Sequence, residues 1–103
     1  DAQLADDNEQ KELRDYLNLL KERTRLTKEY YGYLARAAIS RRHDPTSEDT
    51  DVYTKLAESS KRRLDDNNKL ITLMEEENEQ LKEQALAKAE RAYAKLKYTI
   101  LPR

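Results

Sequence analysis

Side chains recur along this chain at alternating intervals of four and three residues, the spacing that brings them onto one face of an α-helix. Between residues 13 and 38 this seam consists of Leu13, Leu17, Leu20, Thr24, Thr27, Tyr31, Leu34 and Ala38. More than half of the 103 residues are Ala, Glu, Lys, Leu or Arg, and the chain holds a single glycine. Such a composition with helical spacing is typical of long helices and coiled coils. The sequence therefore predicts an all-α fold.

Pro45 marks the boundary between two long helices. A proline lacks the backbone N–H and clashes with the carbonyl four residues earlier, so a helix arriving here stops or kinks. The same place suits a helix start, with Asp44 as the N-cap residue and Thr46 as the alternative cap. We expect a first helical segment over 1–40 whose polar start frays, a linker or kink over 41–51, a coiled-coil helix over 52–98 and a tail over 99–103.

A second stripe widens the apolar face of the first segment: Leu19, Leu26, Tyr30, Tyr33 and Ala37. So broad a face favours contact with two neighbours over a simple two-stranded coil. The tyrosines around residue 31 lie within one helical turn and cannot all face one partner helix. They are expected to pack in a core, with a protein-recognition surface as the alternative.

The short connection at Pro45 is compatible with two architectures. An αα-hairpin would fold the first helix back on the start of the second and bring Leu34 near Val52 or Leu56. An extended or kinked rod would keep these residues apart. The rod is slightly favoured, because a proline permits a kink without reversing the chain.

The second segment carries a heptad repeat of its own. Asn78 falls at position a, three residues before Leu81 at position d. An asparagine at a is typical of parallel two-stranded coiled coils, where the two amides satisfy each other across the seam. The sequence thus predicts a parallel homodimer, with a dimer seam of Leu64, Ile71, Met74, Asn78, Leu81 and Ala85.

The residues Ile71, Met74, Asn78 and Leu81, in the stretch Met-Glu-Glu-Glu-Asn-Glu-Gln-Leu-Lys-Glu-Gln, carry a resemblance at the level of a class. The segment resembles dimeric coiled coils of cytoskeletal, spindle-pole and kinetochore scaffold proteins. Among these it is similar to the microtubule-binding coiled coil of the kinetoplastid kinetochore. The resemblance implies homodimerisation and contact with microtubules through Lys and Arg side chains.

The net charge of −1 is a cancellation between blocks of opposite sign. Residues 21–42 contain seven basic and two acidic residues, and acidic runs follow at 44–51 and 75–79. A basic block attracts an acidic surface. The candidate contacts to an acidic partner are Lys21, Arg23, Arg25, Lys28, Arg36, Arg41 and Arg42.

The residues needed for most kinds of catalysis are missing. The chain has no cysteine and no glycine-rich phosphate loop, and its one histidine, His43, lies beside Asp44 in the linker without a motif around it. We expect no enzyme and no catalytic, cofactor-binding or metal-binding residues. Near-neutral charge does not favour a nucleic-acid binder. The lack of a long apolar run, of Trp and of Phe does not favour a membrane protein.

The expected function is a homodimerising coiled-coil spacer of a cytoskeletal or kinetochore scaffold, whose basic patches contact microtubules or another acidic surface. The alternative is a helical-hairpin adaptor that binds a partner protein through the tyrosine-rich face of the first helix. The expected partners are a second copy of the chain and a microtubule or other protein. Either function is compatible with an intracellular protein, cytoskeletal or nuclear, although the sequence does not determine the localisation.

Overall fold

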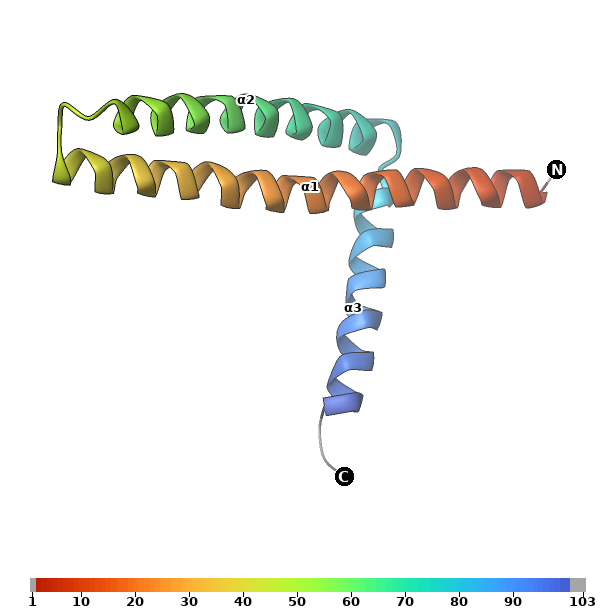
Figure 1. Cartoon of the computed structure of the whole chain (residues 1–103). Coiled ribbons are helices and arrows are strands. Elements are labelled where there is room, and N and C mark those ends of the chain that lie inside the picture. The colour runs from red at the N-terminus through yellow and green to blue at the C-terminus, as the bar shows by residue number, and fades with distance from the viewer. Residues whose placement is uncertain (1, 101–103) are drawn as a thin grey trace. The chain divides into compact units, whose positions relative to one another are not determined.

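The computed structural model describes the backbone of residues 2–100 and the side chains of residues 8–96. This part of the chain is all-helical: α1 spans Ala2–His43, α2 spans Glu48–Glu77 and α3 spans Gln80–Ile100 (Figure 1). It divides into two compact units. We call residues 18–71 the hairpin unit, and residues 1–17 with 72–103 the terminal unit. The expected all-α class is confirmed.

In the hairpin unit, α1 and α2 lie side by side and antiparallel (Figure 1). Two hydrogen bonds join the helices near opposite ends of the unit. The Thr50 hydroxyl donates to Ser40 Oγ at 2.9 Å, and Asn67 Nδ2 donates to the carbonyl of Leu19 at 2.9 Å. The extended or kinked rod is therefore wrong for this unit, because the chain reverses direction between the two helices.

The core of the hairpin unit uses the second stripe of α1. Leu26 and Ala37 of α1 and Ala57, Leu64 and Ile71 of α2 are buried. By contrast, Thr24, Tyr31, Leu34 and Ala38 of the repeat over residues 13–38 remain exposed. The repeat most visible in the sequence of α1 thus does not form the main contact between α1 and α2.

The connection between α1 and α2 is held by polar side chains. Thr46 donates to Asp44 Oδ1 twice, through its backbone N–H at 3.0 Å and its hydroxyl at 2.8 Å. Ser47 Oγ accepts from the N–H of Asp49 at 3.2 Å, so the N-cap of α2 is Ser47. The expected caps, Asp44 and Thr46, are both wrong, because the Asp44 carboxylate and Thr46 close the turn that carries Pro45.

In the terminal unit, the helix expected over 52–98 is interrupted at Asn78. The Asn78 N–H donates to the carbonyl of Met74 and so completes the last turn of α2. Its Oδ1 accepts from the N–H of Gln80 at 3.0 Å and caps α3. A short amide side chain can bond nearby backbone in this way and so competes with a continuous helix.

The terminal unit has its own small core. Leu81, at the start of α3, is fully buried, and Tyr16 of α1 is nearly so. The Tyr16 hydroxyl donates to Glu75 Oε2 at 2.7 Å, while Asn78 Nδ2 donates to Glu12 Oε2 at 3.4 Å. These contacts hold the start of α1 to the junction of α2 and α3.

Paired cysteines test the reversal of the chain. In the variant Ser40→Cys/Thr50→Cys, mild oxidation is expected to form an intramolecular disulfide, because the two native hydroxyl oxygens are 2.9 Å apart. A disulfide needs Cα atoms within about 7 Å. Ten residues of uninterrupted helix would separate them by about 15 Å. Gel mobility and intact mass under reducing and non-reducing conditions provide the measurement. Ser40→Cys/Lys55→Cys, with an exposed second site, is the control that should remain reduced.

Leucine truncations in α3 test the core of the terminal unit. Leu81→Ala is expected to lower the free energy of unfolding by about 2–5 kcal/mol, because this side chain is 0 % exposed. Leu86→Ala, at a residue 60 % exposed in the same helix, should change it by less than about 0.5 kcal/mol. Urea unfolding followed by circular dichroism measures both. Equal effects would contradict the buried position of Leu81.

Candidate interaction surfaces

The residues of the predicted parallel dimer seam already have neighbours within this chain. Leu64 and Ile71 are buried in the hairpin unit. In the terminal unit Leu81 is buried, whereas Met74, Asn78 and Ala85 are half-buried. A parallel coiled coil through these six residues would require the chain to release the contacts that cover them.

The seven basic residues proposed to contact an acidic partner are all exposed, but they differ in their surroundings. Arg25 forms ion pairs with Glu22 and with Glu29, the latter at 3.0 Å. The hydrogen bond and charge of Glu22 raise the pKa of Arg25, while the hydrogen bond from Arg25 lowers the pKa of Glu22. Arg36 stacks over the ring of Tyr33, 5.8 Å from its centre. Arg25 and Arg36 therefore already have partners inside α1.

The five remaining basic residues flank a partly exposed face of α1. We define the α1 outer seam as Leu20, Thr24, Thr27, Tyr31, Leu34 and Ala38. The residues that lie three or four positions from its members, and so border it on the helix surface, are Lys21, Arg23, Lys28, Arg41 and Arg42. The only acidic residues of α1 within the hairpin unit are Glu22 and Glu29, two residues from the nearest seam positions and therefore on another face.

The α1 outer seam is more apolar than its composition suggests. The hydroxyl of Thr24 donates to the carbonyl of Leu20 at 3.2 Å, and that of Thr27 donates to Arg23 at 2.7 Å. Since both hydroxyls bond within the helix, the threonine methyl groups add to the apolar surface. Tyr31 is 62 % exposed and Leu34 is 39 % exposed. The result is an apolar ridge with basic borders.

A hollow of about 460 Å³ lies between the two helices beside Leu34. Its other lining residues are Tyr30, Thr54, Ala57, Glu58, Lys61 and Arg62. Lys61 Nζ lies 3.0 Å from Asp65 Oδ1 and 5.9 Å from the centre of the Tyr30 ring. The hydrogen bond to Asp65 is the main reason why the pKa of Lys61 is raised. Leu34 thus lines this hollow, whose charged lining residues are Glu58, Lys61 and Arg62.

A second repeat, not predicted from the sequence, runs along α2. We define the α2 outer seam as Val52, Leu56, Ser59, Arg63, Asp66, Leu70 and Leu73, which follow the alternating four-and-three spacing along one helix. Its four large apolar side chains are between 39 % and 53 % exposed. The spacing was visible in the sequence, but the repeat through Leu64 and Ile71 is richer in apolar residues and hides it. Thr54 and Lys61, which line the hollow beside Leu34, each lie two residues from the nearest α2 outer seam positions and so on another face of α2. The two outer seams therefore lie on different sides of the hairpin.

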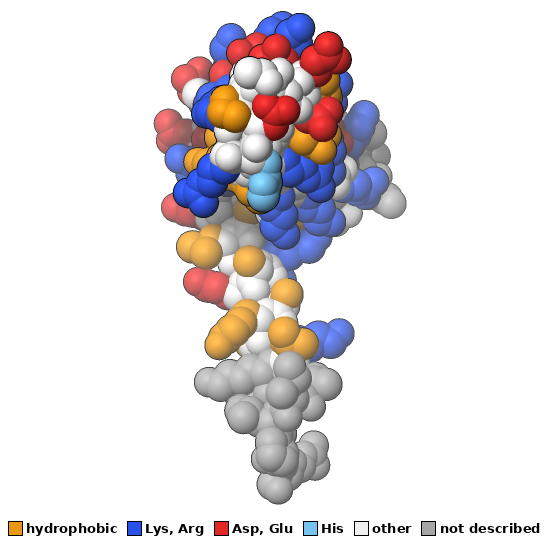
Figure 2. All heavy atoms as spheres, turned by 60° about the vertical axis from the view of Figure 1, so that its left-hand side comes forward, with side chains coloured by type: hydrophobic (Ala, Val, Ile, Leu, Met, Phe, Trp, Pro, Cys, Tyr) orange, Lys and Arg blue, Asp and Glu red, His pale blue; other side chains and the backbone are white. Residues whose placement is uncertain are grey.

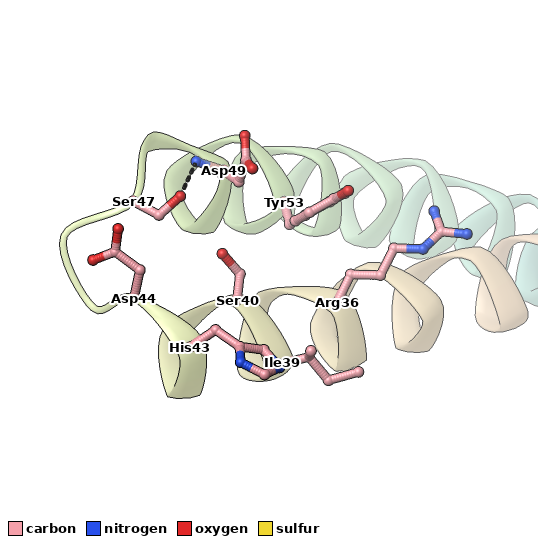
Figure 3. Close-up of a pocket in the computed structure, with 8 residues that line it drawn as sticks. All are labelled: Arg36, Ile39, Ser40, His43, Asp44, Ser47, Asp49 and Tyr53. Carbon is pink, nitrogen blue, oxygen red and sulfur yellow. Dashed lines mark hydrogen bonds between the residues drawn. The ribbon is translucent and has the colours of Figure 1, made fainter.

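A separate hollow of about 350 Å³ lies at the closed end of the hairpin unit (Figure 3). It is lined by Arg36, Ile39, Ser40, His43, Asp44, Ser47, Asp49 and Tyr53. Figure 2 brings this end forward and shows His43 with basic side chains beside and below it and acidic ones above it. The Ser47 hydroxyl oxygen caps α2 and Ser40 Oγ accepts from Thr50. Across residues 8–96 no hydrogen bond joins His43 to either serine, and the side chains offer no nucleophile–base pair here.

A hollow of about 570 Å³ in the terminal unit is lined by Leu13, Glu83, Gln84, Ala87, Lys88 and Arg91. Among the residues whose placement is described, no group of three His, Cys, Asp or Glu side chains could hold a metal ion. No helix within that part is both long and apolar enough to span a bilayer. Comparisons with protein-family models, curated proteins and solved structures find no match to this chain. Its candidate functional surfaces are thus the two outer seams.

The pH dependence of the connection tests the Asp44 turn. The two hydrogen bonds from Thr46 lower the pKa of Asp44. A carboxyl whose pKa is lowered by folding stabilises the folded state above its unfolded pKa, and this contribution is lost as the pH falls through the folded pKa. The Thr46 amide resonance in NMR spectra is therefore expected to titrate below the ordinary aspartate range. In Asp44→Asn this titration should vanish, and a midpoint at the ordinary value in the native chain would contradict the turn.

Proposed function

We propose that this chain is a non-enzymatic helical-hairpin adaptor that binds an amphipathic helix of a partner protein along the α1 outer seam. The supporting observation is that Tyr31 and Leu34 are exposed on a ridge whose borders carry basic but no acidic residues of α1. Charge complementarity requires an acidic partner helix. This is the helical-hairpin alternative of the sequence analysis, now with a defined surface.

The partner helix would supply apolar side chains that cover the α1 outer seam and acidic side chains that face its basic borders. Leucines of the partner would cover Leu34 and the hollow formed with Tyr30 and Ala57, in the way that an amphipathic helix lies in an apolar groove. Full burial of a large apolar side chain contributes about 1.5–3 kcal/mol. Glutamates beside these leucines would face Arg23 and Lys28 on one helix and Lys61 or Arg62 on the other. Such charges contribute mainly to the rate and selectivity of association.

The homodimerising spacer stays a prediction. Its parallel form uses Leu64 and Ile71, which the hairpin unit buries between α1 and α2. The role in a cytoskeletal or kinetochore scaffold and the contact with microtubules stay predictions as well. A microtubule is an acidic surface, so it would meet the same basic borders. The experiment below separates the two kinds of partner.

A designed peptide tests the adaptor proposal. The probe is a fluorescent amphipathic helix with leucine at its a and d positions and glutamate on both borders. It should bind the wild-type chain, and Tyr31→Asp/Leu34→Asp should weaken the binding at least about tenfold, since carboxylates would replace apolar contacts. Fluorescence anisotropy measures the affinity. Leu56→Asp, on the other side of the hairpin, is the matched control that should leave it unchanged.

Three outcomes would contradict the proposal: no binding of the glutamate peptide, equal binding of a peptide with lysine borders, or equal loss in Leu56→Asp. Co-sedimentation with microtubules is the second arm. The microtubule prediction would be favoured instead by three results together. The chain would sediment with microtubules even as Tyr31→Asp/Leu34→Asp, it would no longer do so when Arg41 and Arg42 are replaced, and the wild-type chain would not bind the glutamate peptide. Binding to an acidic surface should also fall sharply between low and physiological salt.

A further inference from the structure

The hairpin unit covers only one of the two repeats of α2. Ala57, Leu64 and Ile71 pack inside the unit, whereas the large apolar members of the α2 outer seam within the unit, Val52, Leu56 and Leu70, are exposed and Ser59 is half-buried. Leu73, which is also exposed, follows on the same helix beyond the unit. All members of the α2 outer seam belong to one uninterrupted helix, so helical periodicity alone aligns them.

Two apolar stretches, Val52 with Leu56 and Leu70 with Leu73, stand at the ends of the α2 outer seam. Between them lie Ser59 and the oppositely charged Arg63 and Asp66.

This order of residues is complementary to itself when reversed. A two-fold axis midway between Arg63 and Asp66 places Arg63 of each copy opposite Asp66 of the other. The same axis places Ser59 opposite Leu70, Leu56 opposite Leu73 and Val52 opposite Glu77 of the other copy, so the complementary layers are the charged centre and the two Leu56–Leu73 layers. Each of these layers pairs an a position with a d position, which is the arrangement of an antiparallel coiled coil. In a two-fold symmetric interface every contact occurs twice, so a self-complementary pattern is what such an interface requires.

Other registers are less favourable for a physical reason. A shift by one heptad places Asp66 opposite Leu56 or Leu70 and leaves both central charges without a partner in an apolar seam. A parallel, in-register pairing through the same residues places Arg63 against Arg63 and Asp66 against Asp66. Like charges at facing positions destabilise a helix pair. The charges therefore select the antiparallel register.

Arg63 and Asp66 are also free to form these pairs. Both are exposed, and within the described residues 8–96 neither forms an ion pair or a side-chain hydrogen bond, although they lie three positions apart on one helix. Their neighbours Lys61 and Asp65 do pair with each other, at 3.0 Å. The charges at the centre of the seam thus remain available while those beside it are satisfied locally.

We infer that a second copy of this chain docks antiparallel on the α2 outer seam, with two symmetric Arg63–Asp66 ion pairs at its centre. The inference does not rest on the proposed adaptor function, because the α1 outer seam lies on another side of the hairpin. It also leaves Leu64 and Ile71 in place inside the hairpin unit. The dimer keeps the hairpin intact, unlike the parallel coiled coil expected from Asn78.

Charge exchange tests the inference by sedimentation equilibrium. The wild-type chain should dimerise in the micromolar range. Arg63→Asp and Asp66→Arg should each weaken dimerisation about a hundredfold, because each turns two attractive pairs into two repulsive ones at about tenfold a pair. The exchange variant Arg63→Asp/Asp66→Arg should regain the dimer. An equimolar mixture of the two single variants should form a heterodimer, since all its central pairs are attractive.

Lys61→Asp is the matched control, because it also replaces a basic residue by aspartate but lies two residues from both Ser59 and Arg63, on another face of α2, and should leave the wild-type dimer intact. Circular dichroism of every variant monitors folding, and the heterodimer shows that the single variants remain folded. Dimerisation of both single variants as tight as that of the wild type would overturn the inference. The inference would also be overturned if the wild-type chain were still monomeric at a protein concentration of about 100 μM. Failure of the two single variants to associate when mixed would overturn it as well. Arg63→Asp should still bind the acidic peptide with the wild-type affinity. This result would show that dimerisation and peptide binding use different surfaces, so that one proposal can fail without the other.

Discussion

The side-by-side packing of α1 and α2 is the interaction on which the rest of the hairpin unit depends. Two helices can bury only the faces they turn toward each other, and a stripe used there is withdrawn from any other partner. Leu26 and Ala37 of α1 meet the face of α2 that carries Ala57, Leu64 and Ile71. Everything left for binding is decided by this choice of faces.

Each helix of the hairpin unit carries two repeats and uses one of them internally. The repeat that remains on α1 is a ridge of tyrosine, leucine and threonine methyl groups with basic borders. The repeat that remains on α2 has apolar ends and a charged centre. Because the two surfaces differ in charge pattern, they suit different occupants. An acidic helix suits the first, and the reversed copy of the same surface suits the second.

Polar side chains determine where the helices end. The carboxylate of Asp44 binds both the backbone and the hydroxyl of Thr46, and Ser47 caps the next helix. At the second break, between α2 and α3, one residue makes both contacts: the amide oxygen of Asn78 caps α3, and its amide nitrogen donates to Glu12 of α1. In each case a short side chain offers the backbone an alternative to the continuing helical ladder. The segment most similar to a leucine zipper is interrupted for this reason.

The sequence by itself determined that the chain is helical and placed a boundary between long helices near Pro45, because periodicity and proline act locally. It also identified the broad second stripe of α1 without indicating that this stripe, rather than the repeat through Tyr31 and Leu34, would face α2. Local spacing cannot rank two repeats on one helix, since the choice depends on which partner is close. Only the tertiary structure decided that the chain reverses, that Leu64 and Ile71 are covered within the hairpin and that Asn78 caps a third helix. Those outcomes depend on contacts between residues far apart in the chain, such as Asn67 with Leu19 and Asn78 with Glu12.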